Sequence, residues 1–177
     1  RADYREYLKN CTAYDEKTFG NVCADLHTLL QEKCAYYFSL VAELKSVFEC
    51  GEYIENAKAS IALCNEICGG LQEIMQSEDY FSACAKQKPK FTAKQRASKK
   101  DTPDFRSCVE QLAEIKKKVS KIYDDELSQT LSYDEELQRF LLSGETASAI
   151  AKYILLFDEK YSKLKSERGA LDYNDLE

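Results

Sequence analysis

Apolar residues recur every three to four positions along most of the 177-residue chain, which is the spacing that places side chains on one face of an α-helix. A first apolar stripe predicts a helix from about residue 22 to 49, and Gly51 is expected to end it. A second stripe predicts a helix over 54–75. Its Gly69-Gly70 pair is expected to fray or kink that helix, because glycine is a poor helix former.

The second half of the chain continues this pattern. Residues 101–104, Asp-Thr-Pro-Asp, have the chemistry of a helix start, and apolar residues then step by three and four over 105–122, with an extension to 127 or 131. A shorter amphipathic piece over 133–144 is expected to stop at its final Ser-Gly. The same stepping returns over 147–164, and Gly169 lies where a left-handed helix cap is expected.

These elements predict an all-α fold, an elongated bundle of about five or six helices. No stretch alternates in the manner of a β-strand, and no internal repeat is found. We expect one domain over residues 1–177. Residues 86–103 are predicted to form a basic, exposed loop, because they are polar and contain both prolines of the chain.

The net charge of −6 argues at first against a nucleic-acid partner, but the positive charges are unevenly distributed. Residues 81–100 hold six Lys, one Arg and no acidic residue. Such a segment can bind the phosphate backbone of DNA, and it can equally be a solubilising surface loop on an acidic body. The candidate DNA-binding residues are Lys86, Lys88, Lys90, Lys94, Arg96, Lys99 and Lys100.

Candidate catalytic chemistry is sparse. The sequence has no Gly-rich phosphate-binding loop, and nothing places an orienting acid beside the single histidine, His27. Cys23 with His27, and Cys64 with Cys68, have a spacing that allows a zinc site, but the same spacing is expected of core-facing cysteines. We therefore assign no catalytic residue and no metal ligand, and interpret the eight cysteines as reduced side chains of an intracellular protein.

No apolar run approaches the length needed to cross a bilayer, so no membrane contact is expected. The first residues, "RADYREYLKN", lack the apolar core of a signal peptide, and the final "LDYNDLE" has the character of a helix start. We interpret the chain as a piece of a longer protein, in which residues 170–177 are the truncated start of the next helix.

The closing stretch 157–177, "FDEKYSKLKSERGALDYNDLE", resembles the AddA (RexA) subunit of bacterial ATP-dependent helicase–nucleases, relatives of RecB among the UvrD-like superfamily 1 helicases. That family has an aromatic-rich helix running into a Leu-Asp-Phe-x-Asp-Leu-Glu motif, and Tyr173 stands here where Phe is usual. The stretch 88–127 is similar, more loosely, to the basic, Pro-containing region and Lys-rich helix of the family. The matching motif residues are Leu171, Asp172, Tyr173, Asp175 and Leu176.

The resemblance implies that the chain is the helical insertion called domain 1B, which interrupts the first RecA-like motor domain. The motif residues would then pack against the motor and start its next helix. ATP and Mg²⁺ would bind to parts of the parent enzyme outside this chain, so the fragment itself would hold no cofactor. The parent would be an ATP-dependent DNA helicase with exonuclease activity, acting with the AddB (RexB) subunit in the bacterial cytoplasm in double-strand break repair and recombination.

Two main functions follow as hypotheses. The first is a non-catalytic module that positions duplex DNA through the basic segment, without reading its sequence. The alternative is a helical protein-interaction module with no nucleic-acid role, which the seams over 105–122 and 147–164 would support if their apolar residues were exposed. A third class, a stand-alone metalloprotein, is addressed by metal analysis.

Overall fold

The computed structural model describes residues 14–50, 57–93 and 101–169. They form five α-helices and one π-helical turn, and none of the described residues lies in a strand. The all-α class predicted from the apolar spacing is confirmed.

The chain divides into two compact units where the sequence analysis expected one domain. The bundle unit is Asn21–Tyr133, and the α6 unit combines Arg1–Gly20 with Asp134–Glu177. The division arises because the aromatic side chains that pack on the start of the last helix come from the N-terminal part of the chain. Tyr14 and Phe19 place their ring centroids 5.0 and 5.3 Å from that of Phe140.

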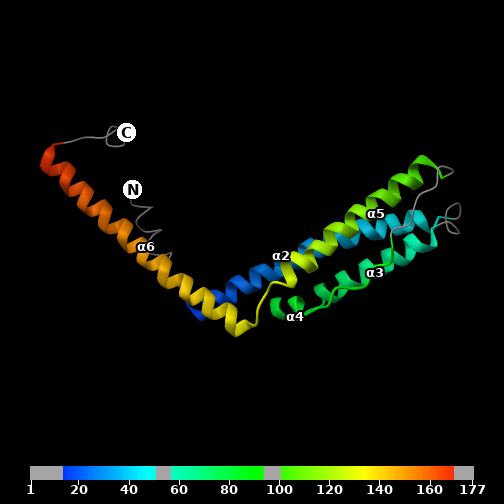
Figure 1. Ribbon diagram of the computed structural model, residues 1–177, viewed down its shortest axis with the longest axis horizontal. Coiled ribbons are helices and arrows are strands. Elements are labelled where there is room, and N and C mark those ends of the chain that lie inside the picture. Colours follow the sequence, from blue (N-terminus) through cyan, green and yellow to red (C-terminus); the bar gives the residue numbers. More distant parts are fainter. Residues whose placement is uncertain (1–13, 51–56, 94–100, 170–177) are drawn as a thin grey trace. The chain divides into compact units, whose positions relative to one another are not determined.

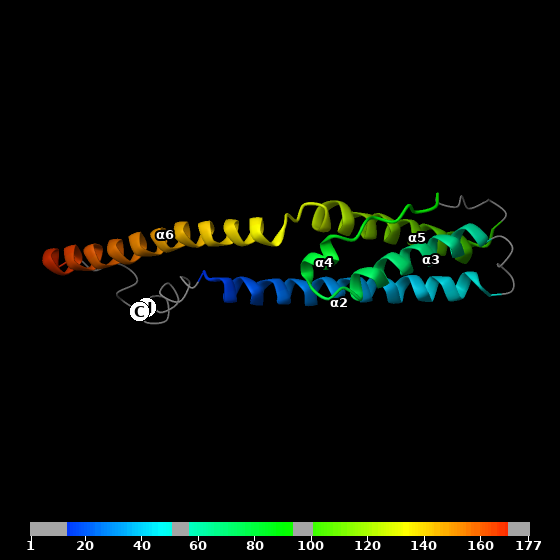
Figure 2. The same cartoon turned by 90° about the horizontal axis from the view of Figure 1, so that it is seen from below.

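The bundle unit is built on three helices that run side by side: α2 (Glu16–Phe48, from Asn21 onward), α3 (Lys58–Met75) and α5 (Pro103–Lys121) (Figures 1 and 2). Their apolar faces meet in one core, as amphipathic helices require. Side chains with 2% exposure or less from all three helices fill this core, among them Val41, Phe48, Leu63, Ile67, Leu112 and Val119.

The start of α5 follows the predicted capping chemistry. The Thr102 hydroxyl oxygen accepts a hydrogen bond from the backbone N–H of Phe105 at 3.3 Å, and Pro103 occupies the first turn. A short helix that the sequence analysis missed, α4 (Tyr80–Cys84), begins in the same way. The Asp79 carboxylate accepts from the N–H of Ser82 at 2.7 Å, and this hydrogen bond lowers the pKa of Asp79.

α5 continues directly into the π-helical turn η1 (Ile122–Leu127). Ile122, Tyr123 and Leu127 are buried, whereas the three acidic residues between them, 124–126, are exposed. A π-helix has a wider turn than an α-helix, so residues spaced as 122, 123 and 127 can share one side. The turn thus continues the buried seam of α5 as far as Leu127.

Two expectations about glycine were wrong. α6 (Tyr133–Arg168) runs through Ser143-Gly144, where the sequence analysis placed a helix end. A Cβ atom on Gly144 would lie 2.2 Å from the Cβ of Tyr14, so this glycine permits a close contact and does not end the helix. α3 likewise remains helical through Gly69-Gly70. Gly169, at φ 60°, follows the last residue of α6 as predicted.

By length and composition alone, α6 contains a stretch apolar enough to cross a bilayer, which the sequence analysis did not recognise. Core helices of soluble proteins pass the same test. In α6, however, only Gly144 and Ala151 are buried among the residues whose exposure is described. The helix therefore has much apolar surface for which the described part of the chain provides no cover.

Candidate nucleic-acid surface

The described half of the predicted basic loop, residues 86–93, is packed against the bundle unit. Pro89 approaches α3 at Gly70, where a Cβ atom would lie 2.6 Å from Pro89 Cγ and 2.7 Å from the Tyr123 hydroxyl. Only glycine leaves room for this approach. Residues 86–93 thus form an irregular segment with four exposed residues, and the segment lies against α3 because a glycine gap on α3 accepts the proline ring.

Polar contacts fix the far end of the same segment. The backbone N–H of Thr92 donates to Glu66 Oε2 at 2.5 Å, and its hydroxyl donates to the other oxygen of the same carboxylate. Lys116 of α5 donates its Nζ to the Thr92 carbonyl at 2.8 Å and lies 6.0 Å from the centroid of the Phe91 ring. The segment is thus tied to both α3 and α5.

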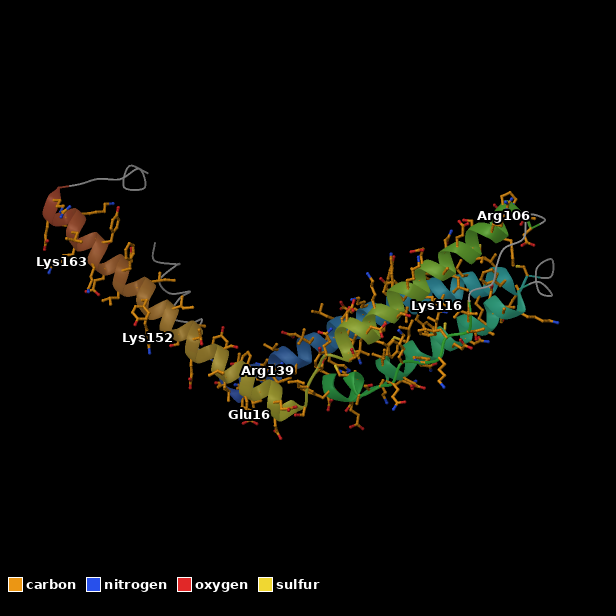
Figure 3. The ribbon with its side chains drawn as sticks, in the orientation of Figure 1. Glu16, Arg106, Lys116, Arg139, Lys152 and Lys163 are labelled. Atoms are coloured by element: carbon orange, nitrogen blue, oxygen red, sulfur yellow. The ribbon has the colours of Figure 1, made fainter. Side chains whose placement is uncertain are left out.

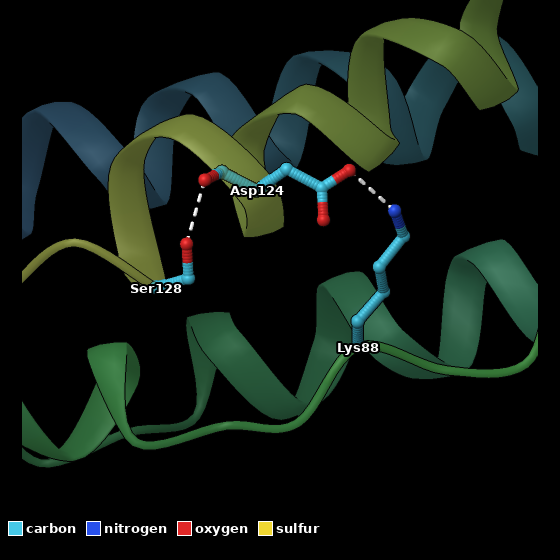
Figure 4. A network of polar contacts seen from close by, with 3 residues as sticks. All are labelled: Lys88, Asp124 and Ser128. Atoms are coloured by element: carbon cyan, nitrogen blue, oxygen red, sulfur yellow. Dashed lines mark hydrogen bonds and ion pairs between the residues drawn. The ribbon is translucent and has the colours of Figure 1, made fainter.

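The three predicted DNA-binding lysines in this segment have different surroundings. Lys88 reaches across to η1 and pairs with Asp124 Oδ2 at 2.5 Å (Figure 4). The backbone carbonyl of Asp124 in turn accepts from the Ser128 hydroxyl at 2.6 Å. Lys90 is exposed and Lys86 is half-buried.

The other predicted contacts cannot be placed in this way. Four of the seven basic residues, Lys94, Arg96, Lys99 and Lys100, lie outside the described residues. The motif residues Leu171, Asp172, Tyr173, Asp175 and Leu176 also lie outside them. The assignments of these residues stay predictions.

Sequence reasoning missed the lysines of α5 and the contact of one of them, Lys116, with the basic segment. Lys116 contacts Phe91 and Thr92, as described above, and is labelled with Arg106 on α5 in Figure 3. Lys117 and Lys121 are exposed and one helical turn apart, and Asp124, the partner of Lys88, follows Lys121 by three residues. In the sequence, the Lys-Lys-Lys run at 116–118 is the sign of a further basic region. It was not counted with residues 81–100, because acidic residues lie between that stretch and the run.

We define the basic surface of the bundle unit as six lysines of the segment 86–93 and of α5: Lys86, Lys88, Lys90, Lys116, Lys117 and Lys121. Two of the six have acidic partners, because Lys117 also pairs with Glu114 at 2.6 Å. Both pairs are largely solvent-exposed, and exposed ion pairs contribute about 0–1 kcal/mol. A phosphate can therefore replace either carboxylate at little cost.

The described residues offer little for catalysis. Burial raises the pKa of the Cys34 thiol to about 11 and that of the Cys64 thiol to about 12, so both stay protonated and unreactive near neutral pH. His27 Nε2 is buried without a hydrogen-bond partner. Within the described ranges, no three His, Cys, Asp or Glu side chains gather as a metal site, so Cys23, His27, Cys64 and Cys68 do not form the zinc set considered from the sequence.

A second feature lies on α6. We define the α6 stripe as seven large apolar residues between positions 142 and 164 that are 45–73% exposed: Leu142, Ile150, Tyr153, Leu156, Phe157, Tyr161 and Leu164. At 100° per residue these positions fall within one face of the helix. The predicted seam over 105–122 is by contrast buried in the bundle core. Of the two seams considered for protein interaction, only the one on α6 exposes its large side chains.

Comparisons of the chain with protein-family models, with curated proteins and with solved structures found no match.

Proposed function

We propose that this chain is a non-catalytic, DNA-positioning module of an ATP-dependent DNA helicase–nuclease subunit. Its family assignment rests on the resemblance of residues 157–177, and more loosely of 88–127, to AddA subunits. The structural observation that carries the DNA contact is the packed segment 86–93, which holds Lys86, Lys88 and Lys90 beside the lysines of α5. The parent would bind ATP and Mg²⁺ outside this chain and act with an AddB subunit.

A lysine on a packed segment loses less conformational freedom on binding than one on a free loop, so each contact contributes more to affinity. Contacts from lysine to phosphate oxygens fix position and orientation but do not read sequence. The acidic remainder of the chain opposes DNA binding, which confines the contact to the basic surface. The chain would thus guide a duplex for a motor located elsewhere in the parent.

The test measures the binding of the full chain to a duplex. The fluorescence anisotropy of a labelled DNA reports binding over a range of salt concentrations. Reversing the charge of Lys86, Lys88 and Lys90 to Glu should raise Kd at least about tenfold at low salt. If all three lysines contact phosphates, the slope of log affinity against log salt should flatten by about 2.7.

A matched control changes the net charge equally but elsewhere. Lys17, Lys58 and Arg139 are exposed and lie outside the basic surface, and Figure 3 labels Arg139. Their triple change to Glu should leave both Kd and the salt slope close to those of the unaltered chain. An equal loss of affinity in both triple variants would show that only net charge matters, and would contradict the assignment.

A helical protein-interaction module remains a second candidate function, and one observation favours it. The α6 stripe exposes seven large apolar side chains on one face of a helix, and contiguous apolar patches of this size mark interaction sites in soluble proteins. The two functions are compatible in one chain, because the basic surface belongs to the bundle unit and the stripe to the α6 unit.

A further inference from the structure

We propose that the α6 stripe binds the α6 stripe of a second copy of this chain, with the two helices antiparallel. The inference rests on the second candidate function, the interaction module, and is independent of DNA binding. Three properties of α6 support it: the area of the stripe, the fit of a side chain to a hollow on the same helix, and the placement of its charges.

The area matches that of a stable pair. With about 200 Å² for a fully exposed large side chain, the exposed fractions of the stripe residues correspond to roughly 800 Å² of apolar surface on one copy. A symmetric pair would bury about twice that area, which equals a standard-size specific interface. One copy is therefore large enough to cover the other.

A hollow of about 320 Å³ lies on the same helix, lined by Glu145, Ala149, Lys152, Tyr153 and Leu156. Ala149 lies four residues before Tyr153, and Phe157, 68% exposed, lies four residues after it. An antiparallel pair centred on Tyr153 therefore brings Phe157 of each copy opposite the hollow at Ala149 of the other. A large side chain facing a small one is the arrangement that knobs-into-holes packing uses.

The charges favour the antiparallel orientation. Glu145 and Lys163 are eighteen residues apart, which is five helical turns, so both lie on one flank of the stripe. In a pair centred on Tyr153, Glu145 of one copy lies beside Lys160 and Lys163 of the other. A parallel pair in register would instead keep Glu145 five helical turns away from Lys163 of the second copy, so this attraction would be lost. Lys163 is free to exchange partners, because its pair with Glu167 within the helix is long, at 4.0 Å, and exposed.

The oligomeric state of the full chain tests the proposal by sedimentation velocity over a concentration series. We expect a reversible dimer, with a dissociation constant raised at least about tenfold by Phe157→Asp and by Ala149→Trp, which fills the hollow. The matched control is Leu29→Asp on α2, an apolar position that is 60% exposed and lies outside the α6 unit. It should leave the dimer unchanged, and circular dichroism should show equal helix content in all variants.

A charge exchange tests the orientation. Glu145→Lys alone should weaken the dimer, and combining it with Lys163→Glu should restore it, because the pairing is then reversed on both sides of the symmetric contact. Failure of the double variant to restore dimerisation would contradict the antiparallel register.

A chain that stays monomeric at all concentrations overturns self-association. Binding of an environment-sensitive apolar dye then tests the second candidate function, the helical protein-interaction module. Dye fluorescence that is lost in Phe157→Asp but kept in Leu29→Asp would show that another protein or another part of the parent covers the stripe. Dye fluorescence equal in both variants would contradict the interaction module as well.

Discussion

At the scale of single residues, the neighbouring glycines of α3 have opposite roles. Gly70 faces the basic segment, and a side chain there would meet Pro89 and Tyr123, whereas a Cβ atom on Gly69 would have no neighbour within 4 Å. Gly70 thus sets how closely residues 86–93 approach α3. Gly69 contributes only the low helix propensity of its residue type.

Gly70→Ala should destabilise the chain by about 1–3 kcal/mol, because the added methyl group overpacks the contact with Pro89. Gly69→Ala should stabilise it by up to about 1 kcal/mol, because alanine is the better helix former. Chemical denaturation followed by circular dichroism gives both values. Hydrogen exchange of residues 90–93 should increase in the first variant alone, and a similar response of both variants would contradict the distinct role of Gly70.

The cysteines make a second test at this scale. Cys34 and Cys64 have no exposed surface and raised pKa values, whereas Cys50 is exposed. Native-state alkylation read by mass spectrometry should modify Cys50 before Cys34 and Cys64, and it should leave these two unmodified until the chain unfolds. Raising the pH to about 9 should not make Cys34 and Cys64 react, since their thiolates form only near their pKa values of about 11 and 12. Early modification of either would contradict the described burial.

At the scale of the elements, sequence reasoning succeeded where local chemistry decides and failed where a distant partner decides. The start of α5 at Thr102-Pro103 and the cap at Gly169 depend on residues within one turn, so the sequence sufficed. The expected helix end at Gly144 was wrong, because that glycine serves a contact with Tyr14, which is 130 positions away in the chain. The contact of Pro89 with Gly70 was missed for the same reason.

The candidate basic surface was partly predictable on the same grounds. Lys86, Lys88 and Lys90 stand out as part of an acid-free run. Lys116 joins them because its Nζ reaches the carbonyl of Thr92, a contact that no local pattern predicts. The exposure of the α6 stripe was likewise open at the sequence level, since an apolar seam has the same spacing whether or not it is covered.

The contact of Gly144 with Tyr14 gives a prediction for α6. Gly144→Ala should release the Tyr14 and Phe19 side chains from α6, because the new methyl group would lie only 2.2 Å from Tyr14 Cβ. Hydrogen exchange over residues 15–20 should accelerate, while circular dichroism of the helix is preserved or increased, because alanine favours helix. Gly20→Ala is the matched control, since a Cβ atom on Gly20 has no neighbour within 4 Å. Equal exchange in the two variants would rule out the contact.

At the scale of the whole molecule, buried thiol and phenol groups make the free energy of unfolding depend on pH. Burial raises the pKa of Cys34 and Cys64 from the ordinary 9.0 to about 11 and 12, and it raises that of Tyr123 as well. Above pH 9 the unfolded chain releases these thiol protons while the folded chain keeps them. The stability they contribute is therefore complete below pH 9 and is lost as pH rises through about 11–12.

We therefore expect the free energy of unfolding to be constant between about pH 7 and 8.5 and to fall from about pH 9 upward. Urea denaturation at fixed ionic strength measures it. The pair Cys34→Ala and Cys64→Ala would lower stability at every pH by leaving cavities, but should flatten the alkaline decline. A decline of unchanged steepness in this double variant would assign the effect to other groups, Tyr123 among them.

The π-helical turn at Ile122–Leu127 bears on whether the chain can lose a residue at this point. The turn accommodates one residue more than an α-helical turn would, and the three exposed acidic residues at 124–126 occupy its outer side. Removing one of them would restore ordinary helical winding and leave Leu127 on the same side as Ile122, because five residues of a π-turn and four residues of an α-helix both complete about one turn. We therefore expect the loss of one exposed acidic residue here to leave the helix unbroken and the buried side chains on both sides of the turn in place.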